Sequence, residues 1–207
     1  MDSILFSSIA QVLVFGLIPL IVYLIRARTF KRFFRSTGLY STPPIGAKLG
    51  ILAGFVLAGG YFLLLNYLPG AKAAFLAEDA NAGMIRSFDD PVERITAILL
   101  FAGLKTSLAE ELLFRGFVGR SLIRGIGYSS GNLLQAVIFG ILSTVLLLDL
   151  DGVTLLLRVF PFLLSTAAGY CAGYLNTKWG NGSIWPGWTM HAVGDLILYV
   201  VLVFFVK

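Results

Sequence analysis

Six apolar runs, each long enough to cross a bilayer as a helix, constrain this chain more than any other feature. A membrane-spanning helix needs roughly 20 predominantly apolar residues, since each residue advances it by about 1.5 Å. With 57% hydrophobic and 13% charged residues among 207, the chain carries more apolar surface than a soluble domain of this length can bury. The predicted spans are Ile4–Ile25, Ile45–Leu68, Val92–Val118, Asn132–Leu148, Val153–Leu175 and Ile184–Val206. We therefore predict an all-α, polytopic helical membrane protein with about six transmembrane helices.

The connections between these spans alternate between basic and acidic, and this alternation orients the predicted helices, because basic loops face the cytoplasm. The basic connections carry Arg26, Arg28, Lys31, Arg32, Arg35 and Lys48, then Arg120 and Arg124, and then Lys178. The opposite connections carry Glu78, Asp79, Asp89 and Asp90, and then Asp149 and Asp151. We expect an integral protein of a bacterial inner (plasma) membrane with both termini outside the cytoplasm. The net charge of +5 then reflects topology rather than nucleic-acid binding.

The first basic connection also contains three phenylalanines, Phe30, Phe33 and Phe34. One interpretation is a cytoplasmic anchor whose aromatic rings dip into the membrane interface. The other is a specific site for an anionic lipid. The sequence leaves both open, and membrane lipids are expected partners in either case.

We interpret residues 1–207 as a single membrane domain. Residues 1–90 would supply the N-terminal spans, the basic loop and an amphipathic segment, and residues 91–207 a four-helix core. Residues 69–89 are too polar to span and predict a surface helix or lid.

Asp90 as N-cap and Pro91 in the first turn predict the start of a helix, which would be about 50 Å long if it continued to Arg124. The patterns at 50–54 and 169–173 have glycines four residues apart, as close helix packing requires.

Three charged residues, Glu110, Glu111 and Arg115, lie within six positions of the third predicted span. A charge at the centre of a membrane helix costs about 2.5–3.5 kcal/mol on insertion scales. The three must therefore be paired or face a wet cavity, which indicates a functional site. Glu111 and Arg115 are four residues apart and can pair on one face. Glu110 is turned about 100° away on a regular helix, so we expect it to face a cavity as a general base.

His191 and Asp195 form a second pair spaced by four residues, in the sixth predicted span. A carboxylate one turn away orients an imidazole. A satisfied polar pair between helices is the simpler interpretation of these two residues alone. Glu110 lies about 21 Å along its helix from Arg124, and His191 about 10 Å from the start of its span. We expect both to meet in one cavity that opens to the cytoplasm.

These residues also carry a family resemblance. Residues 110–115 (EELLFR) match the EExxxR motif of the CAAX-protease and bacteriocin-processing family, also called the Abi family. The chain resembles the membrane-embedded proteases related to the type II CAAX prenyl endopeptidase. Residues 169–191 resemble the family's approach to its last motif, HxxxN/D. The resemblance covers about residues 97–200.

The resemblance implies an intramembrane endopeptidase that hydrolyses a peptide bond near the cytoplasmic face. Glu110 would activate the water, with Glu111 and Arg115 as its support. His191 and Asp195 match the motif whose residues are thought to stabilise the oxyanion. The substrate would be a peptide or protein at the membrane, and the sequence leaves open a prenylated C-terminus, a leader peptide or another membrane protein.

Two positions depart from the family pattern. In residues 139–143 (FGILS), Ser143 stands where the family has histidine, and serine is neither a base nor a good metal ligand at neutral pH. Asp195 replaces the commoner asparagine and donates a hydrogen bond only when protonated. The alternative function is therefore a catalytically inactive relative that acts as a membrane scaffold or binding protein.

Other chemistries use the same residues. A divalent metal, if one binds, would take its ligands from Glu110, His191 and Asp195, although HExxH is absent and zinc proteases usually supply two histidines. The set Ser143, His191 and Asp195 has the composition of a nucleophilic triad, but no GxSxG pattern surrounds the serine. A small transporter or proton pathway also uses intramembrane charges, but the chain shows no inverted repeat. No cofactor is firmly predicted.

Overall fold

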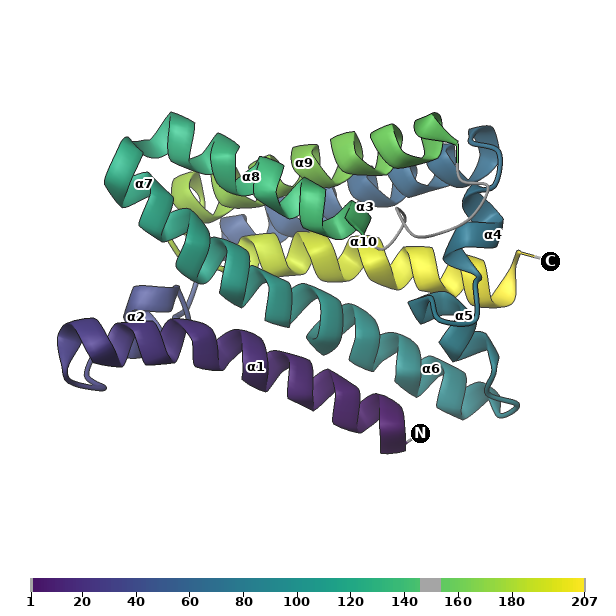
Figure 1. Ribbon diagram of the computed structural model, residues 1–207, viewed down its shortest axis with the longest axis horizontal. Helices are drawn as coiled ribbons and strands as arrows, with labels where there is room; N and C mark the ends of the chain where they lie inside the picture. The colour runs from purple at the N-terminus through teal and green to yellow at the C-terminus, as the bar shows by residue number, and fades with distance from the viewer. Residues whose placement is uncertain (1, 146–153, 207) are drawn as a thin grey trace.

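The computed structural model describes residues 2–145 and 154–206, most of which lie in helices (Figure 1). They are α1 (Asp2–Ala27), α2 (Phe33–Thr37), α3 (Pro44–Tyr67), α4 (Ala71–Phe75), α5 (Asn81–Arg86), α6 (Pro91–Leu100), η1 (Phe101–Leu108), η2 (Glu111–Gly119), α7 (Arg120–Ile126), α8 (Tyr128–Val145), α9 (Leu155–Lys178) and α10 (Trp185–Phe204). No strand occurs among the described residues. The prediction of an all-α polytopic protein is confirmed.

Four helices have the length and composition needed to cross a membrane. They are Ile4–Ala27, Pro44–Tyr67, Leu155–Lys178 and Trp185–Phe204. The predicted span at 92–118 lies inside the long helix from α6 to α7, which carries Glu110, Glu111 and Arg115. The predicted span at 132–148 begins in α8, but its last three residues, together with Asp149 and Asp151, lie outside the described residues. That these two segments also cross the bilayer stays a prediction.

The long helix starts as its sequence predicts, because the Asp90 carboxylate accepts a hydrogen bond from the Val92 N–H at 2.9 Å. It then departs from regular α-helix. Phe101–Leu108 and Glu111–Gly119 are π-helical, with wider turns. Inside the first of these segments, the Trp188 indole N–H of α10 donates to the Gly103 carbonyl at 2.8 Å. The π segments flank Glu110, and such segments are frequent at functional sites.

Close approaches at glycine join the helices in pairs. A Cβ at Gly50 of α3 would lie 2.0 Å from the Thr189 hydroxyl oxygen of α10. A Cβ at Gly173 of α9 would lie 1.9 Å from the Asn132 amide oxygen of α8. A side chain at Gly50 would also meet the Pro186 backbone carbonyl at 2.4 Å, and one at Gly173 would displace the buried Asn132 amide. The predicted close packing at both small-residue patterns is thereby confirmed.

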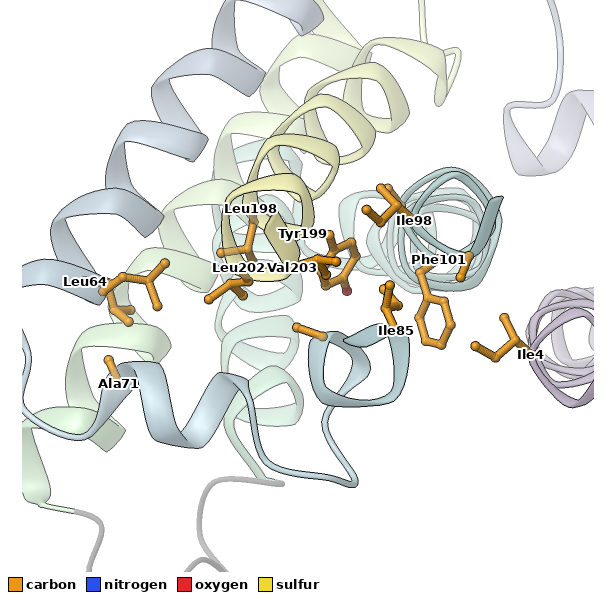
Figure 2. Close-up of a cluster of buried hydrophobic side chains, with 14 of the residues drawn as sticks. Ile4, Leu64, Ala71, Ile85, Ile98, Phe101, Leu198, Tyr199, Leu202 and Val203 are labelled. Atoms are coloured by element: carbon orange, nitrogen blue, oxygen red, sulfur yellow. The ribbon is translucent and has the colours of Figure 1, made fainter. Parts of the chain in front are cut away.

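Short helices α4 and α5 close one end of the bundle (Figure 1). The prediction that residues 69–89 form surface helices rather than a span is confirmed. Ala82 and Ile85 of α5 are buried and join an apolar cluster with Phe101 of η1 and Tyr199 of α10 (Figure 2). Both termini lie at this end of the molecule, and the α1–α2, α7–α8 and α9–α10 connections lie at the other (Figure 1). The basic connections therefore gather at one end.

Candidate active site

Glu111 and Arg115, both buried, form an ion pair across one turn of η2. The Arg115 Nη1 atom lies 3.1 Å from Glu111 Oε1. The other carboxylate oxygen, Oε2, accepts a hydrogen bond from the Asn176 side-chain amide of α9 at 3.4 Å. The Asn176 amide oxygen in turn accepts the Gly187 N–H of α10 at 2.7 Å. Three helices therefore fix the position of Glu111.

The first turn of α10 leaves no room beside this carboxylate. A Cβ at Gly187 would lie 2.4 Å from Glu111 Oε2 and 2.9 Å from the Asn176 side-chain nitrogen. Glycine at position 187 is what allows α10 to approach η2 so closely. That approach brings His191, one turn further along α10, next to the two glutamates.

The His191 imidazole lies among three carboxylates. Its Nε2 atom is 3.8 Å from Glu110 Oε2 and 3.5 Å from Asp195 Oδ2. Its Nδ1 atom is 3.9 Å from Glu111 Oε1. The Phe139 ring of α8 packs edge-on against the imidazole, with ring centroids 5.9 Å apart. Carboxylates and an aromatic ring thus restrict the orientation of the imidazole.

Asp195 is held from two further helices. The Thr106 hydroxyl of η1 donates to Asp195 Oδ2 at 2.6 Å, and the Tyr61 hydroxyl of α3 donates to Oδ1 at 3.4 Å. Asp195 is buried, so these donors replace the water that a buried carboxylate loses. They fix Asp195 next to His191 Nε2.

Glu110 differs from its neighbour Glu111 in exposure. The Glu110 side chain is 24% exposed and the Glu111 side chain 0%. No hydrogen bond reaches the Glu110 carboxylate from any residue in the described parts of the chain. Glu110 therefore presents a carboxylate with free acceptor positions beside an imidazole.

Comparison with known families decides what this arrangement belongs to. The model of the type II CAAX prenyl endopeptidase Rce1-like family matches residues 92–197. The chain belongs to this family. The match supports the function of a CAAX-type membrane protease, and it contains all six residues that the sequence singled out. No curated protein and no solved structure matches the chain.

Five of the six predicted site residues come together, and Ser143 does not join them. Ser143 is exposed on α8, and its hydroxyl donates to the Phe139 carbonyl of its own helix at 2.8 Å. No hydrogen bond links Ser143 to His191 or Asp195 in the described residues, so the triad hypothesis gains no geometric support. The second motif contributes Phe139 instead, whose ring also lies 4.1 Å from the Arg115 guanidinium carbon.

Within residues 2–145 and 154–206, no group of three or more His, Cys, Asp or Glu side chains is arranged to hold a metal ion. Glu110, His191 and Asp195 lie near one another, but across 3.5–3.8 Å and with His191 between the two carboxylates. A divalent metal at these residues stays an untested prediction.

Sequence reasoning did not identify four residues that shape the site: Tyr61, Thr106, Asn176 and Gly187. Asn176 is a polar amide within a predicted span, and that signal alone could have identified it as a partner for a charge. Thr106 lies one turn before Glu110. Tyr61 gives no signal in the sequence, because its role depends on α3 packing against α10.

Proposed function

We propose that this protein is an intramembrane endopeptidase that hydrolyses a peptide bond with a water activated by Glu110. One observation carries the proposal: Glu110 Oε2 faces His191 Nε2 across 3.8 Å. At that separation one water molecule can hydrogen-bond both atoms at ordinary distances of about 2.8 Å. Such a water would contact a free carboxylate and an imidazole at the same time.

The reaction proceeds in two steps. Glu110 accepts a proton from the water as its oxygen attacks the carbonyl carbon of the scissile bond. His191 donates a hydrogen bond to the oxyanion that develops on the carbonyl oxygen. Glu110 then passes its proton to the leaving amine as the C–N bond breaks. Acid and base chemistry are thus both assigned to one carboxylate.

The surrounding residues hold these two groups in position. Arg115 and Asn176 fix Glu111, which lies beside His191 Nδ1 and helps to orient the imidazole. Thr106 and Tyr61 fix Asp195 on the other side. Preorganised groups of this kind contribute to catalysis because they need no rearrangement during the reaction.

The proposed substrate is a peptide or protein at the membrane, cleaved near the cytoplasmic face. The gathering of the basic connections at one end of the molecule supports an orientation with that end in the cytoplasm and both termini on the opposite side. A bacterial inner membrane is the location we propose. The experiment below also identifies whether the substrate is prenylated.

The test is a survey of protein N-termini and C-termini in membranes of the native cell. It compares wild type with Glu110→Gln at equal expression, because glutamine keeps the shape and removes the base. Glu93→Gln, on the same helix but in its first turn, is the matched control. We expect cut ends that depend on Glu110 and persist in Glu93→Gln, and these ends identify the substrate.

Identical profiles for wild type and Glu110→Gln, under conditions where the protein has a phenotype, would overturn the proposal. They would favour the catalytically inactive scaffold, the function suggested by serine at position 143. A phenotype that survives Glu110→Gln would distinguish that scaffold from a protease.

A further inference from the structure

We propose that a cavity between α1, α2, η2 and α7 binds the headgroup phosphate of an anionic phospholipid. The cavity has a volume of about 220 Å³. It lies at the end of the molecule where the basic connections gather, and Glu110 and His191 are not among its lining residues. The inference is independent of the proposed proteolysis.

Two arginines from separate helices supply the charge. Arg26 comes from the last turn of α1 and Arg124 from α7, and both line the cavity. No acidic side chain lines it. Neither guanidinium makes a hydrogen bond or ion pair with another residue in the described parts of the chain. An uncompensated pair of guanidinium groups suits a phosphate, which accepts their paired N–H donors.

The hydroxyl groups in the wall are already engaged. Ser36 donates to the Phe33 carbonyl at 2.7 Å, and Thr37 donates to the same carbonyl at 3.2 Å. The Tyr23 hydroxyl donates to the Lys31 carbonyl. The two arginines are therefore the donors left for a ligand, and the expected ligand is an anion rather than a neutral sugar or alcohol.

The surroundings of the cavity favour a lipid over a soluble phosphate. Its other walls include the apolar residues Pro19, Val22 and Phe117. The α1 helix, which has the length and composition of a span, exposes Leu17 and Ile21 along its outer surface. A ligand held here thus has apolar surface on the membrane side and arginines at the helix end, as a phospholipid requires.

The basic loop beside the cavity completes a membrane-interface surface. Phe30 and Phe34 are exposed there, and aromatic side chains prefer the headgroup region. Phe30, Phe33 and Phe34 pack against one another with ring centroids 5.6–5.7 Å apart. The anchor and the specific lipid site, which the sequence offered as alternatives, are therefore combined: the phenylalanines set the depth and the two arginines bind the phosphate.

The experiment measures thermal unfolding of the full-length protein in neutral detergent with added phosphatidylglycerol, phosphatidylcholine or inorganic phosphate. A ligand that binds only the folded state raises the midpoint. We expect phosphatidylglycerol to stabilise wild type, with little effect from the other two. In Arg26→Gln/Arg124→Gln the apparent affinity should fall about tenfold or more, as expected when charge-assisted hydrogen bonds are lost.

The matched control is Arg28→Gln/Arg32→Gln, which removes two charges from the basic loop between α1 and α2 but none from the cavity lining. It should keep the wild-type response. An equal loss in both double variants would overturn the specific site in favour of general loop charge. An equal response to inorganic phosphate would overturn the lipid as ligand.

A variant that keeps the positive charge separates a loss of lipid binding from a failure of the double variant to fold. Arg124→Lys retains the positive charge but loses the paired donors of guanidinium, so it should fold and bind phosphatidylglycerol more weakly than wild type. Native mass spectrometry of wild type should also show one retained phosphatidylglycerol. Unchanged binding by Arg124→Lys together with no retained lipid would contradict the proposal.

Discussion

Glu110 and Glu111 are neighbours in the chain but have opposite surroundings. Glu111 is enclosed by Arg115 and Asn176, whereas Glu110 has free acceptor positions. A buried carboxylate needs such partners, because an isolated charge is costly away from water. The proposed mechanism requires this difference: Glu111 is held in place, while the Glu110 carboxylate stays free to accept a hydrogen bond from water.

Gly187→Ala should disturb the position of the Glu111 carboxylate, because the new methyl would lie 2.4 Å from Glu111 Oε2. The carboxylate or α10 must move, and a displacement of about 1 Å near the reacting groups can lower turnover about 100-fold. Cleavage by purified protein against the substrate found in the membrane survey measures the loss. Gly59→Ala is the control, since a Cβ there meets nothing within 4 Å.

A second variant shows whether Gly187→Ala acts through Glu111. If it does, adding it to Glu111→Gln should cost much less than it costs alone, because residues in one network are not additive. Fully additive losses would mean that the alanine acts elsewhere, for example by separating α10 from α9.

At the scale of elements, the short helix α5 covers the end of the bundle where the two termini lie, and its apolar side packs into the core (Figure 1). Ile85 is 0% exposed and packs in the cluster with Phe101 and Tyr199 (Figure 2). The Asn81 side chain donates to the Tyr199 hydroxyl at 3.1 Å and accepts from Lys105 at 3.4 Å. Apolar burial of Ile85 and two hydrogen bonds of Asn81 therefore act together.

Ile85→Ala should loosen α5 without unfolding the long helices. Replacing a fully buried isoleucine by alanine costs about 2–5 kcal/mol, which is large for a helix of six residues. Hydrogen exchange should become faster across α4 and α5 and stay unchanged in α3 and α10. Glu78→Gln, at an exposed position just before α5, should leave exchange unchanged. Faster exchange throughout the bundle would contradict the view that α5 is a separate cap.

At the scale of the whole molecule, the sequence predicted the helices well because apolar run length and capping residues act locally. The Asp90 cap and the glycine pairs on α3 and α9 are examples. The π segments could not be predicted, because their stabilising contacts, such as Trp188 on the Gly103 carbonyl, come from distant parts of the chain. The motifs of the site were visible because their residues are close in sequence. Tyr61 was not, because it reaches Asp195 from a distant helix, α3.

The orientation in the membrane is the largest-scale prediction. Cys171 is the single cysteine, so a Cys171→Ala background allows one new cysteine at a time. Glu78→Cys and Lys178→Cys change exposed residues, the first between α4 and α5 and the second at the end of α9, and these elements lie at opposite ends of the molecule (Figure 1). On intact spheroplasts, an impermeant maleimide should label Glu78→Cys and reach Lys178→Cys only after lysis, because the basic end is expected in the cytoplasm. The reverse pattern would move the basic end outside. Labelling of both before lysis would contradict a bundle whose two ends lie on opposite sides of the bilayer.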